Sequence, residues 1–209
     1  MSQNKITNKK NILILTQLAI FTAIEVIFCF TPLGSIPITG GGIVATLAHI
    51  PALVVAVTLG KLPALYMGAA MGVCSLIWWS TIGVVQPSAF AFTPFAINGN
   101  IWSLIICIVP RILLPFIAAV IFDFLKSKIK TIPAAAVAGA VASFLHSAMV
   151  LGLIFICFYN NTAVGNDFVT FIVVWGGVNA ILEIAMGAIF AAALVIPLNK
   201  VKRTISNSR

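Results

Sequence analysis

Charged side chains are scarce in this chain of 209 residues. Asp and Glu occur four times in total, and all charged residues together make up 8% of the sequence. Hydrophobic residues account for 61%, which is more apolar surface than a soluble domain of this length hides from water. The shortage of charge therefore excludes an ordinary soluble domain and predicts an integral membrane protein.

Several motifs of catalysis and metal binding are also missing. The four cysteines lie in four apolar segments without CxxC spacing, and the two histidines lack metal-ligand spacing, so we expect structural cysteines and no metal site. There is no GxxxxGK[ST] phosphate loop, so the chain does not bind ATP in that way. No paired acids or nucleophile-and-base arrangement is visible. We therefore expect neither an enzyme nor a bound cofactor.

Basic residues, by contrast, follow a clear pattern. All but one of the twelve Lys and Arg residues form four short clusters between apolar stretches. The clusters are Lys5, Lys9 and Lys10; Lys61; Lys126, Lys128 and Lys130; and Lys200, Lys202, Arg203 and Arg209. If the chain crosses a membrane six times, every cluster falls on one side, and the cytoplasmic excess of Lys and Arg predicts cytoplasmic N and C termini. The net charge of +8 thus indicates topology rather than nucleic-acid binding.

Six apolar stretches are long enough to cross a bilayer as helices. We predict an all-α integral membrane protein of the cell membrane, with one six-helix bundle over residues 1–209. The predicted helices lie at about 11–30, 43–59, 62–80, 98–124, 133–158 and 168–197. Gly and Pro residues mark the long connections after the first and third helices. With this topology, both of those loops face outward.

Five ionisable residues lie inside these apolar stretches, namely Glu25, His49, Arg111, His146 and Glu183. Each costs several kcal/mol in hydrocarbon, as an order of magnitude, unless it is paired, hydrated or facing a ligand. Glu25 and His49 belong to helices joined by an outer loop and can meet there. Arg111 and Glu183 lie nearer mid-depth. Arg111 either forms a buried ion pair with Glu183 or receives the carboxylate or phosphate of a ligand, and both can hold together.

Other polar residues extend this candidate site. Asn179 lies one turn before Glu183, so both project from the same helix face. Asn98 and Asn100 open the fourth predicted helix, where they either cap it or present its free backbone donors to an anion. Trp175, about one turn into the sixth predicted helix, is a candidate ligand contact.

Small residues four positions apart predict two faces of close helix packing. Ala19 and Ala23 form one such step in the first predicted helix, and Gly68 and Gly72 form another in the third. Such steps let helix backbones approach closely in membranes. On their own they indicate only that both faces pack on something.

Four segments resemble the substrate-binding S components of energy-coupling factor (ECF) vitamin transporters, which are six-helix membrane proteins of about this size. They are Phe30–Ile38 (FTPLGSIPI), Ala48–Ala52 (AHIPA), Val109–Leu113 (VPRIL) and Asn179–Glu183 (NAILE). The resemblance covers nearly the whole chain and is greatest to the pantothenate-type branch. The chain departs from that pattern at Leu182, where relatives often carry Pro, and at Ala52, where they carry a bulkier aliphatic residue.

The resemblance implies the substrate-capture subunit of an ATP-driven importer. A small water-soluble vitamin, with pantothenate as first choice, binds from outside in a cavity covered by the first and third outer loops and lined by helices four to six. The implied partners are a membrane scaffold subunit and two ATPase subunits. The loaded subunit topples in the bilayer, and the face of Ala19 and Ala23 docks on the scaffold.

Within this picture Arg111 neutralises the vitamin carboxylate and Glu183 orients Arg111, while Asn179, His146 and Asn98 or Asn100 satisfy hydroxyl and amide groups. The candidate substrate contacts are Arg111, Asn179, Glu183, His146, Asn98, Asn100, Trp175 and His49. Two alternatives stay open. One is an S component for pyridoxine or a hydroxymethyl-pyrimidine. The other is a stand-alone proton-coupled transporter with Glu25 and Glu183 as proton sites, although no inverted repeat is visible.

Overall fold

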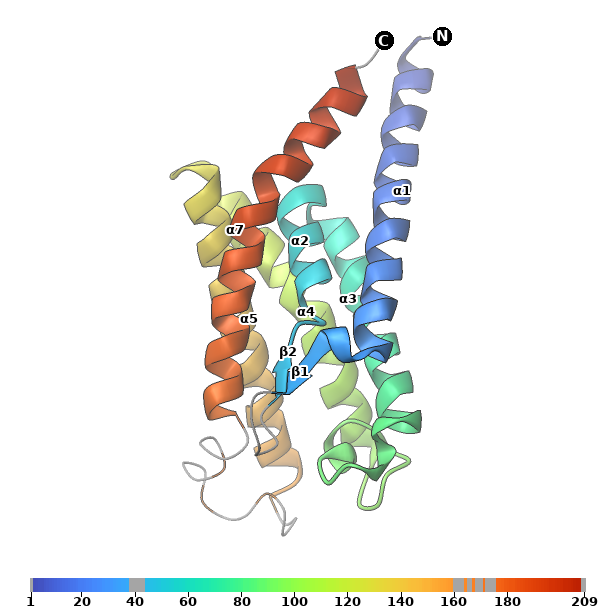
Figure 1. The fold of residues 1–209 in the computed structure, drawn as a ribbon, viewed down its shortest axis with the longest axis vertical. Coiled ribbons are helices and arrows are strands. Elements are labelled where there is room, and N and C mark those ends of the chain that lie inside the picture. The colour runs from blue at the N-terminus through green and yellow to red at the C-terminus, as the bar shows by residue number, and fades with distance from the viewer. Residues whose placement is uncertain are drawn as a thin grey trace.

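The computed structural model is a helical bundle, and it describes residues 2–37, 44–159, 164, 167, 171 and 176–207. Its helices in this part of the chain are α1 (Ser2–Phe30), α2 (Ile50–Leu59), α3 (Lys61–Thr81), α4 (Ile101–Leu125), α5 (Thr131–Cys157) and α7 (Gly177–Asn207). They run alternately up and down the long axis of the molecule (Figure 1). The 3-10 turns are η1 (Pro32–Gly34), η2 (Gly83–Val85) and η3 (Ala89–Ala91), and the strands are β1 (Ser35–Pro37) and β2 (Val44–Thr46).

Five helices of the described chain are long and apolar enough to cross a membrane. These spans are Asn11–Phe30, Lys61–Thr81, Ile101–Leu125, Thr131–Cys157 and Asn179–Val201, in agreement with five of the predicted helices. At about 1.5 Å per residue, the ten residues of α2 cover only about 15 Å, or roughly half of a bilayer core. The bundle is therefore an integral membrane fold in which α2 is a half-length helix.

The predicted helix over 43–59 is wrong in its first part. Residues 44–46 form β2, which pairs antiparallel with β1 so that Ser35 faces Thr46, and helix α2 begins only at Ile50. This hairpin is also a small exception to the predicted all-α class. An apolar run without periodicity does not distinguish a strand from a buried helix, and β-branched residues such as Val44 and Thr46 favour the strand.

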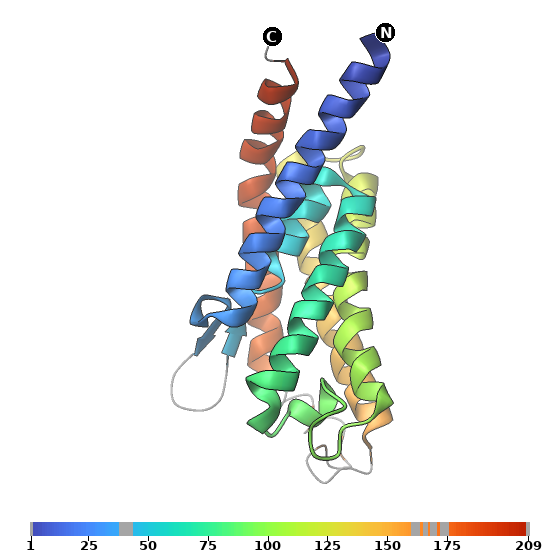
Figure 2. The same ribbon diagram turned by 90° about the vertical axis from the view of Figure 1, so that its right-hand side faces the viewer.

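Two helix ends also differ from the prediction. Helix α1 begins at Ser2 and α7 ends at Asn207, whereas the apolar runs placed these ends at 11 and 197. Both helices continue past the hydrophobic stretch into polar, basic sequence and project beyond the other helices at the same end of the bundle (Figure 2). Hydrophobicity marks where a helix meets lipid, but helical hydrogen bonds continue into water.

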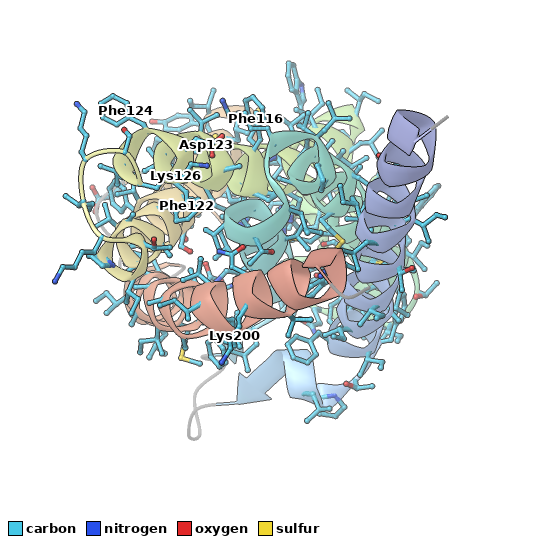
Figure 3. The ribbon with its side chains drawn as sticks, turned by 90° about the horizontal axis from the view of Figure 1, so that it is seen from above. Phe116, Phe122, Asp123, Phe124, Lys126 and Lys200 are labelled. Carbon is cyan, nitrogen blue, oxygen red and sulfur yellow. The ribbon has the colours of Figure 1, made fainter. Side chains whose placement is uncertain are left out.

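The two termini lie at one end of the bundle (Figure 1), and basic side chains gather at that end. Gly60, whose positive φ of 95° suits glycine, makes the turn from α2 to α3. The next residue, Lys61, lies 3.6 Å from Asp123 near the end of α4, and Lys126 contacts the same carboxylate. Asp123 and Lys126 lie where α4 ends, Lys200 lies in the last two turns of α7, and the view from above labels all three (Figure 3). The predicted same-side arrangement of these clusters fits the fold, whereas their cytoplasmic location stays a prediction.

Helix α4 is held against α3 by glycine. A Cβ atom at Gly68 would lie 2.7 Å from both the carbonyl oxygen of Arg111 and Cα of Ile112, so only glycine permits this approach. One turn later, a Cβ atom at Gly72 would lie 3.5 Å from Cα of Ile108, an ordinary contact. The predicted close packing of this face is confirmed, and it sets the position of the α4 backbone at Arg111.

Candidate functional site

Arg111 is buried in the bundle, with 8% of its surface exposed, and a proline controls its local geometry. Pro110 has no N–H, so the carbonyl of Ile106 lacks its usual helical partner. Nη1 of Arg111 donates to that carbonyl at 2.8 Å. The guanidinium also lies over the Phe92 ring, 4.9 Å from its centroid. The proline defect and the aromatic ring thus fix a cation inside an apolar bundle.

Glu183 does not form the predicted ion pair with Arg111. No carboxylate lies within 4.0 Å of Arg111 in the described part of the chain. Glu183 instead accepts hydrogen bonds from Oγ of Ser147 at 2.9 Å and from Nδ2 of Asn179 at 3.4 Å. The predicted shared face of Asn179 and Glu183 is confirmed, and Ser147 is a partner that sequence reasoning missed.

The two histidines border the same interior. His146 is buried, and its Nδ1 lies 3.1 Å from the carbonyl oxygen of Pro110, so a neutral His146 that donates there keeps Nε2 as an acceptor. His49 directly precedes α2 and is 3% exposed, and its Nε2 has no hydrogen-bond partner among the described residues. His49 forms no hydrogen bond with Glu25, the partner that sequence reasoning had suggested.

Asn100 caps helix α4, which is one of its two predicted roles, whereas Asn98 lies before the helix. Helix α4 begins at Ile101, so the predicted start at 98 is three residues early. Oδ1 of Asn100 accepts from the backbone N–H of Trp102 at 2.8 Å, and Oγ of Ser103 accepts from that of Asn100, which forms a capping box. Asn98 has a φ of 64° and precedes the helix. Capping is therefore the observed role of Asn100.

Arg111 follows Asn100 by eleven positions, which corresponds to about 16 Å along a helix. The cap is therefore separate from the buried cluster around Arg111.

Trp175 lies outside the described residues, so its predicted contact with a ligand stays a prediction. His146 of α5 contacts the carbonyl of Pro110, the residue before Arg111 on α4, and Ser147 of α5 binds Glu183 of α7. We call Arg111, His146, Ser147, Asn179 and Glu183 the polar layer.

Several buried polar atoms have no hydrogen-bond partner among the described residues. They are Oε1 of Gln17, both carboxyl oxygens of Glu25, Nε2 of His49, Oγ of Ser143 and Oδ1 of Asn179. Leaving such an atom unpaired costs about 1–3 kcal/mol. Ser143 lies one turn before Ser147 on α5, and sequence reasoning missed it because serines are common in membrane helices. Its position three residues before His146 was the available signal.

These unpaired atoms indicate what the interior can bind. Asn179 belongs to the polar layer, and Ser143 lies three residues before His146 and one turn before Ser147 on α5. With Arg111, the interior therefore contains a cation, hydroxyl and amide groups and imidazole nitrogens in apolar surroundings. This combination suits a small anion that also carries hydrogen-bonding groups. Within the described residues, no three His, Cys, Asp or Glu side chains are grouped to hold a metal ion.

An apolar cavity of about 170 Å³ lies apart from the polar layer, between α1, α2 and α7. Its lining consists of hydrophobic side chains such as Phe21, Leu47 and Phe190. It has no group that can neutralise an anion or pair with a hydroxyl. The polar layer is therefore better suited than this cavity to hold an anion.

Comparison with known proteins gives one relevant relative. The chain is 25% identical over 190 residues to the "Pantothenic acid transporter PanT" of Lactococcus lactis subsp. cremoris (strain MG1363). The alignment covers 88% of this chain and 93% of that protein. No family model matches the chain. The similarity agrees with, and thus confirms, the resemblance to the pantothenate-type branch that the four sequence segments indicated.

Proposed function

We propose that this protein is the substrate-capture subunit of an ATP-driven ECF vitamin importer and that its substrate is pantothenate. The observation that carries the proposal is Arg111, a buried cation that no carboxylate of the described chain contacts within ion-pair distance. A buried charge without an ion-pair partner is costly inside a membrane bundle. The carboxylate of pantothenate would supply the missing anion, and the name of the PanT relative supports this choice.

The remainder of the ligand matches the remainder of the site. Pantothenate carries an amide and two hydroxyl groups besides its carboxylate. Oγ of Ser143 and Oδ1 of Asn179 are buried without partners, and a neutral His146 offers one ring nitrogen. Ligand groups that reach these atoms would supply hydrogen bonds that the described residues do not provide. Glu183 accepts a hydrogen bond from Nδ2 of Asn179 at 3.4 Å, which orients the amide of Asn179.

The direct test is binding of labelled pantothenate to the purified protein. We expect saturable binding that unlabelled pyridoxine and a hydroxymethyl-pyrimidine do not displace. Arg111→Ala should weaken binding by roughly 30-fold or more, because losing one partner of a buried charge pair costs about 2–5 kcal/mol. Arg111→Lys keeps the charge without the planar fork and should bind with intermediate affinity. Displacement by a neutral competitor together with weak pantothenate binding would reject the substrate.

Two features support the proposed energising partners, namely the missing phosphate-binding loop and an exposed face of small residues on α1. The chain contains no phosphate-binding loop, so ATP-driven transport requires other subunits. Ala19 and Ala23 are exposed on α1, next to the exposed side chain of Ile20. A small-residue face of this kind suits docking of another membrane helix. In the proposed cycle this face contacts the scaffold subunit while the loaded bundle topples.

Replacing both alanines of this face by leucine tests the docking role. The variant Ala19→Leu/Ala23→Leu should bind pantothenate normally but support little uptake, and a scaffold subunit and two ATPases should co-purify with the original chain only. Ala148, which is exposed on α5, offers a matched control because Ala148→Leu adds bulk to a different face. Uptake that a protonophore abolishes while cellular ATP is held constant would instead favour a proton-coupled transporter.

A further inference from the structure

Helices α1 and α3 pack side by side and run in the same direction, because both begin at the terminal end of the bundle (Figure 2). One contact shows how they are aligned, since Oγ1 of Thr22 on α1 lies 3.5 Å from Sδ of Met67 on α3. Seven residues make almost two full helical turns. The residues seven positions further along the two helices therefore face each other again, and they are Cys29 and Cys74.

A second observation brings the two thiol groups together. The side chains of Cys29 and Cys74 form a hydrogen bond with each other, and both are free thiols. Cys74 is buried, with 8% of its surface exposed. Cys29 is partly exposed and lies one residue before the end of α1. The pair thus combines a buried thiol with one that a reagent at the helix end can reach.

The same face of α1 carries a buried acid. Glu25 lies three residues after Thr22 and one turn before Cys29, so it shares their face toward α3. Glu25 is 0% exposed, and neither of its oxygens accepts a hydrogen bond in the described structure. A leucine of similar size would pack there at lower cost. Packing alone therefore does not explain Glu25, whereas a carboxylate with unoccupied oxygens can accept the proton of a neighbouring thiol.

We propose that Cys29 and Cys74 are a redox-active pair that closes to a disulfide between α1 and α3, with Glu25 as the proton acceptor. Cys29, the more exposed thiol, passes its proton to the Glu25 carboxylate, and its thiolate attacks one sulfur of an external low-molecular-weight disulfide. The S–S bond of that oxidant breaks, and one half leaves. Cys74 then attacks the mixed disulfide and releases the other half.

The electrons and protons of this exchange balance. The two cysteine thiols lose two electrons and two protons, and the two halves of the oxidant take them up and leave as thiols. The proton that Glu25 accepts passes to the first departing half, so the carboxylate is regenerated. The reaction needs no metal ion and no group that the oxidant does not supply.

The predicted topology places this pair where an oxidant is available. Cys29 lies at the end of α1 opposite the chain termini, and the distribution of Lys and Arg predicts that this end is outside the cytoplasm. Disulfides form and persist in such oxidising surroundings. The bond would fasten α1 to α3, the helix whose Gly68 contacts the α4 backbone at Arg111. The inference does not depend on the proposed function, because it concerns only the thiol pair and Glu25.

The test uses the full chain with Cys107→Ala/Cys157→Ala, which leaves only Cys29 and Cys74. After incubation of the purified protein with oxidised glutathione, we expect no free thiol to react with a maleimide under denaturing conditions. The intact mass should fall by that of two hydrogen atoms. The matched control Cys74→Ala/Cys107→Ala retains Cys29 and Cys157, and it should form no internal bond because Cys157 lies on α5. Thiols that stay free, or glutathione adducts that never close, would overturn the proposal.

Thermal unfolding shows whether the bond ties the two helices together. The oxidised protein should unfold roughly 5–15 °C above the reduced one, as expected for a disulfide that restricts the unfolded chain, and dithiothreitol should reverse the shift. An unchanged or lower unfolding temperature would mean that the bond does not fit the native packing of α1 on α3, which would overturn the proposal.

The rate of closure tests the role of Glu25. Glu25→Gln should slow formation of the disulfide at least about tenfold, because it removes the proton acceptor, and the reduced variant should unfold no earlier than the reduced parent. Gln17→Leu is the matched control, since Gln17 also holds a buried unpaired oxygen on α1 but lies two turns away, and it should close at the parent rate. Equal rates in both variants would overturn the assignment of Glu25.

Discussion

Charged groups at the terminal end of the bundle and in its middle behave in opposite ways. At the end, Asp123 contacts both Lys61 and Lys126, and all three side chains are about one-third to one-half exposed. In the middle, Arg111 and Glu25 are buried and neither contacts an opposite charge within the described residues. Paired, exposed charges change the stability of the fold little, and their distribution indicates the orientation of the protein in the membrane. A buried, unpaired cation destabilises the fold, which is why we propose that Arg111 binds the anionic group of a ligand.

The largest expected effect is a difference in cysteine labelling between the two ends of the bundle, which tests whether the basic end faces the cytoplasm. In a variant whose four native cysteines are replaced by alanine, single cysteines at Val85 and Ser127 report opposite ends of the bundle. Val85 is 87% exposed in η2, and Ser127 is exposed just after α4. If the basic end is cytoplasmic, a membrane-impermeant maleimide should label Val85→Cys in intact cells and Ser127→Cys only after permeabilisation. The reverse labelling would overturn the predicted topology.

The next effect tests how the interior cation is positioned. Gly68→Ala brings a Cβ atom to 2.7 Å from the Arg111 carbonyl oxygen, so α4 must shift. Such overpacking typically costs about 1–3 kcal/mol, and we expect both a lower unfolding temperature in detergent and weaker pantothenate binding. Gly72→Ala, where the contact distance is 3.5 Å, is the matched control and should change neither. Equal tolerance of both variants would mean that α3 does not fix the position of Arg111.

Variants of two serines one turn apart on α5 distinguish an effect on the stability of the ligand-free protein from an effect on ligand binding. Oγ of Ser147 donates to Glu183 at 2.9 Å, whereas Oγ of Ser143 has no partner in the described structure. Ser147→Ala should therefore destabilise the ligand-free protein by about 1–3 kcal/mol, because it leaves Glu183 short of a donor. Ser143→Ala should leave that stability unchanged but reduce the rise in unfolding temperature that pantothenate produces. If Ser143→Ala lowered ligand-free stability as much, Ser143 would be structural.

Local patterns in the sequence predicted the parts of the fold that depend on short-range physics. Five long apolar runs matched five membrane-capable helices, because about 20 apolar residues are required wherever a helix crosses a bilayer. The capping role of Asn100 was one of two readings, since Asn at a helix start and Ser three residues later can satisfy each other locally. Such features do not depend on how the helices are rotated against one another.

The missed features depend on that rotation. Glu183 is paired with Ser147 rather than Arg111, and helices that are apolar on every face provide no periodicity from which to read their facing sides. The strand β2 was missed because the run before α2 is apolar without a period. The isolation of the Glu25 carboxyl could not be predicted either, since only the packing of α1 on its neighbours shows which polar atoms lack partners.

The smallest expected effect concerns the paired charges at the terminal end. Asp123→Asn removes the carboxylate that Lys61 and Lys126 share, but exposed ion pairs contribute only about 0–1 kcal/mol. Asp123 also lies near the C-terminal end of α4, where the helix dipole disfavours a negative charge. We expect a shift in unfolding temperature close to the error of measurement, and the shift should disappear in about 1 M NaCl, where the Debye length is about 3 Å. A large, salt-resistant loss would mean that charge pairs at this end are as structurally demanding as buried ones, and burial would no longer separate the two regions.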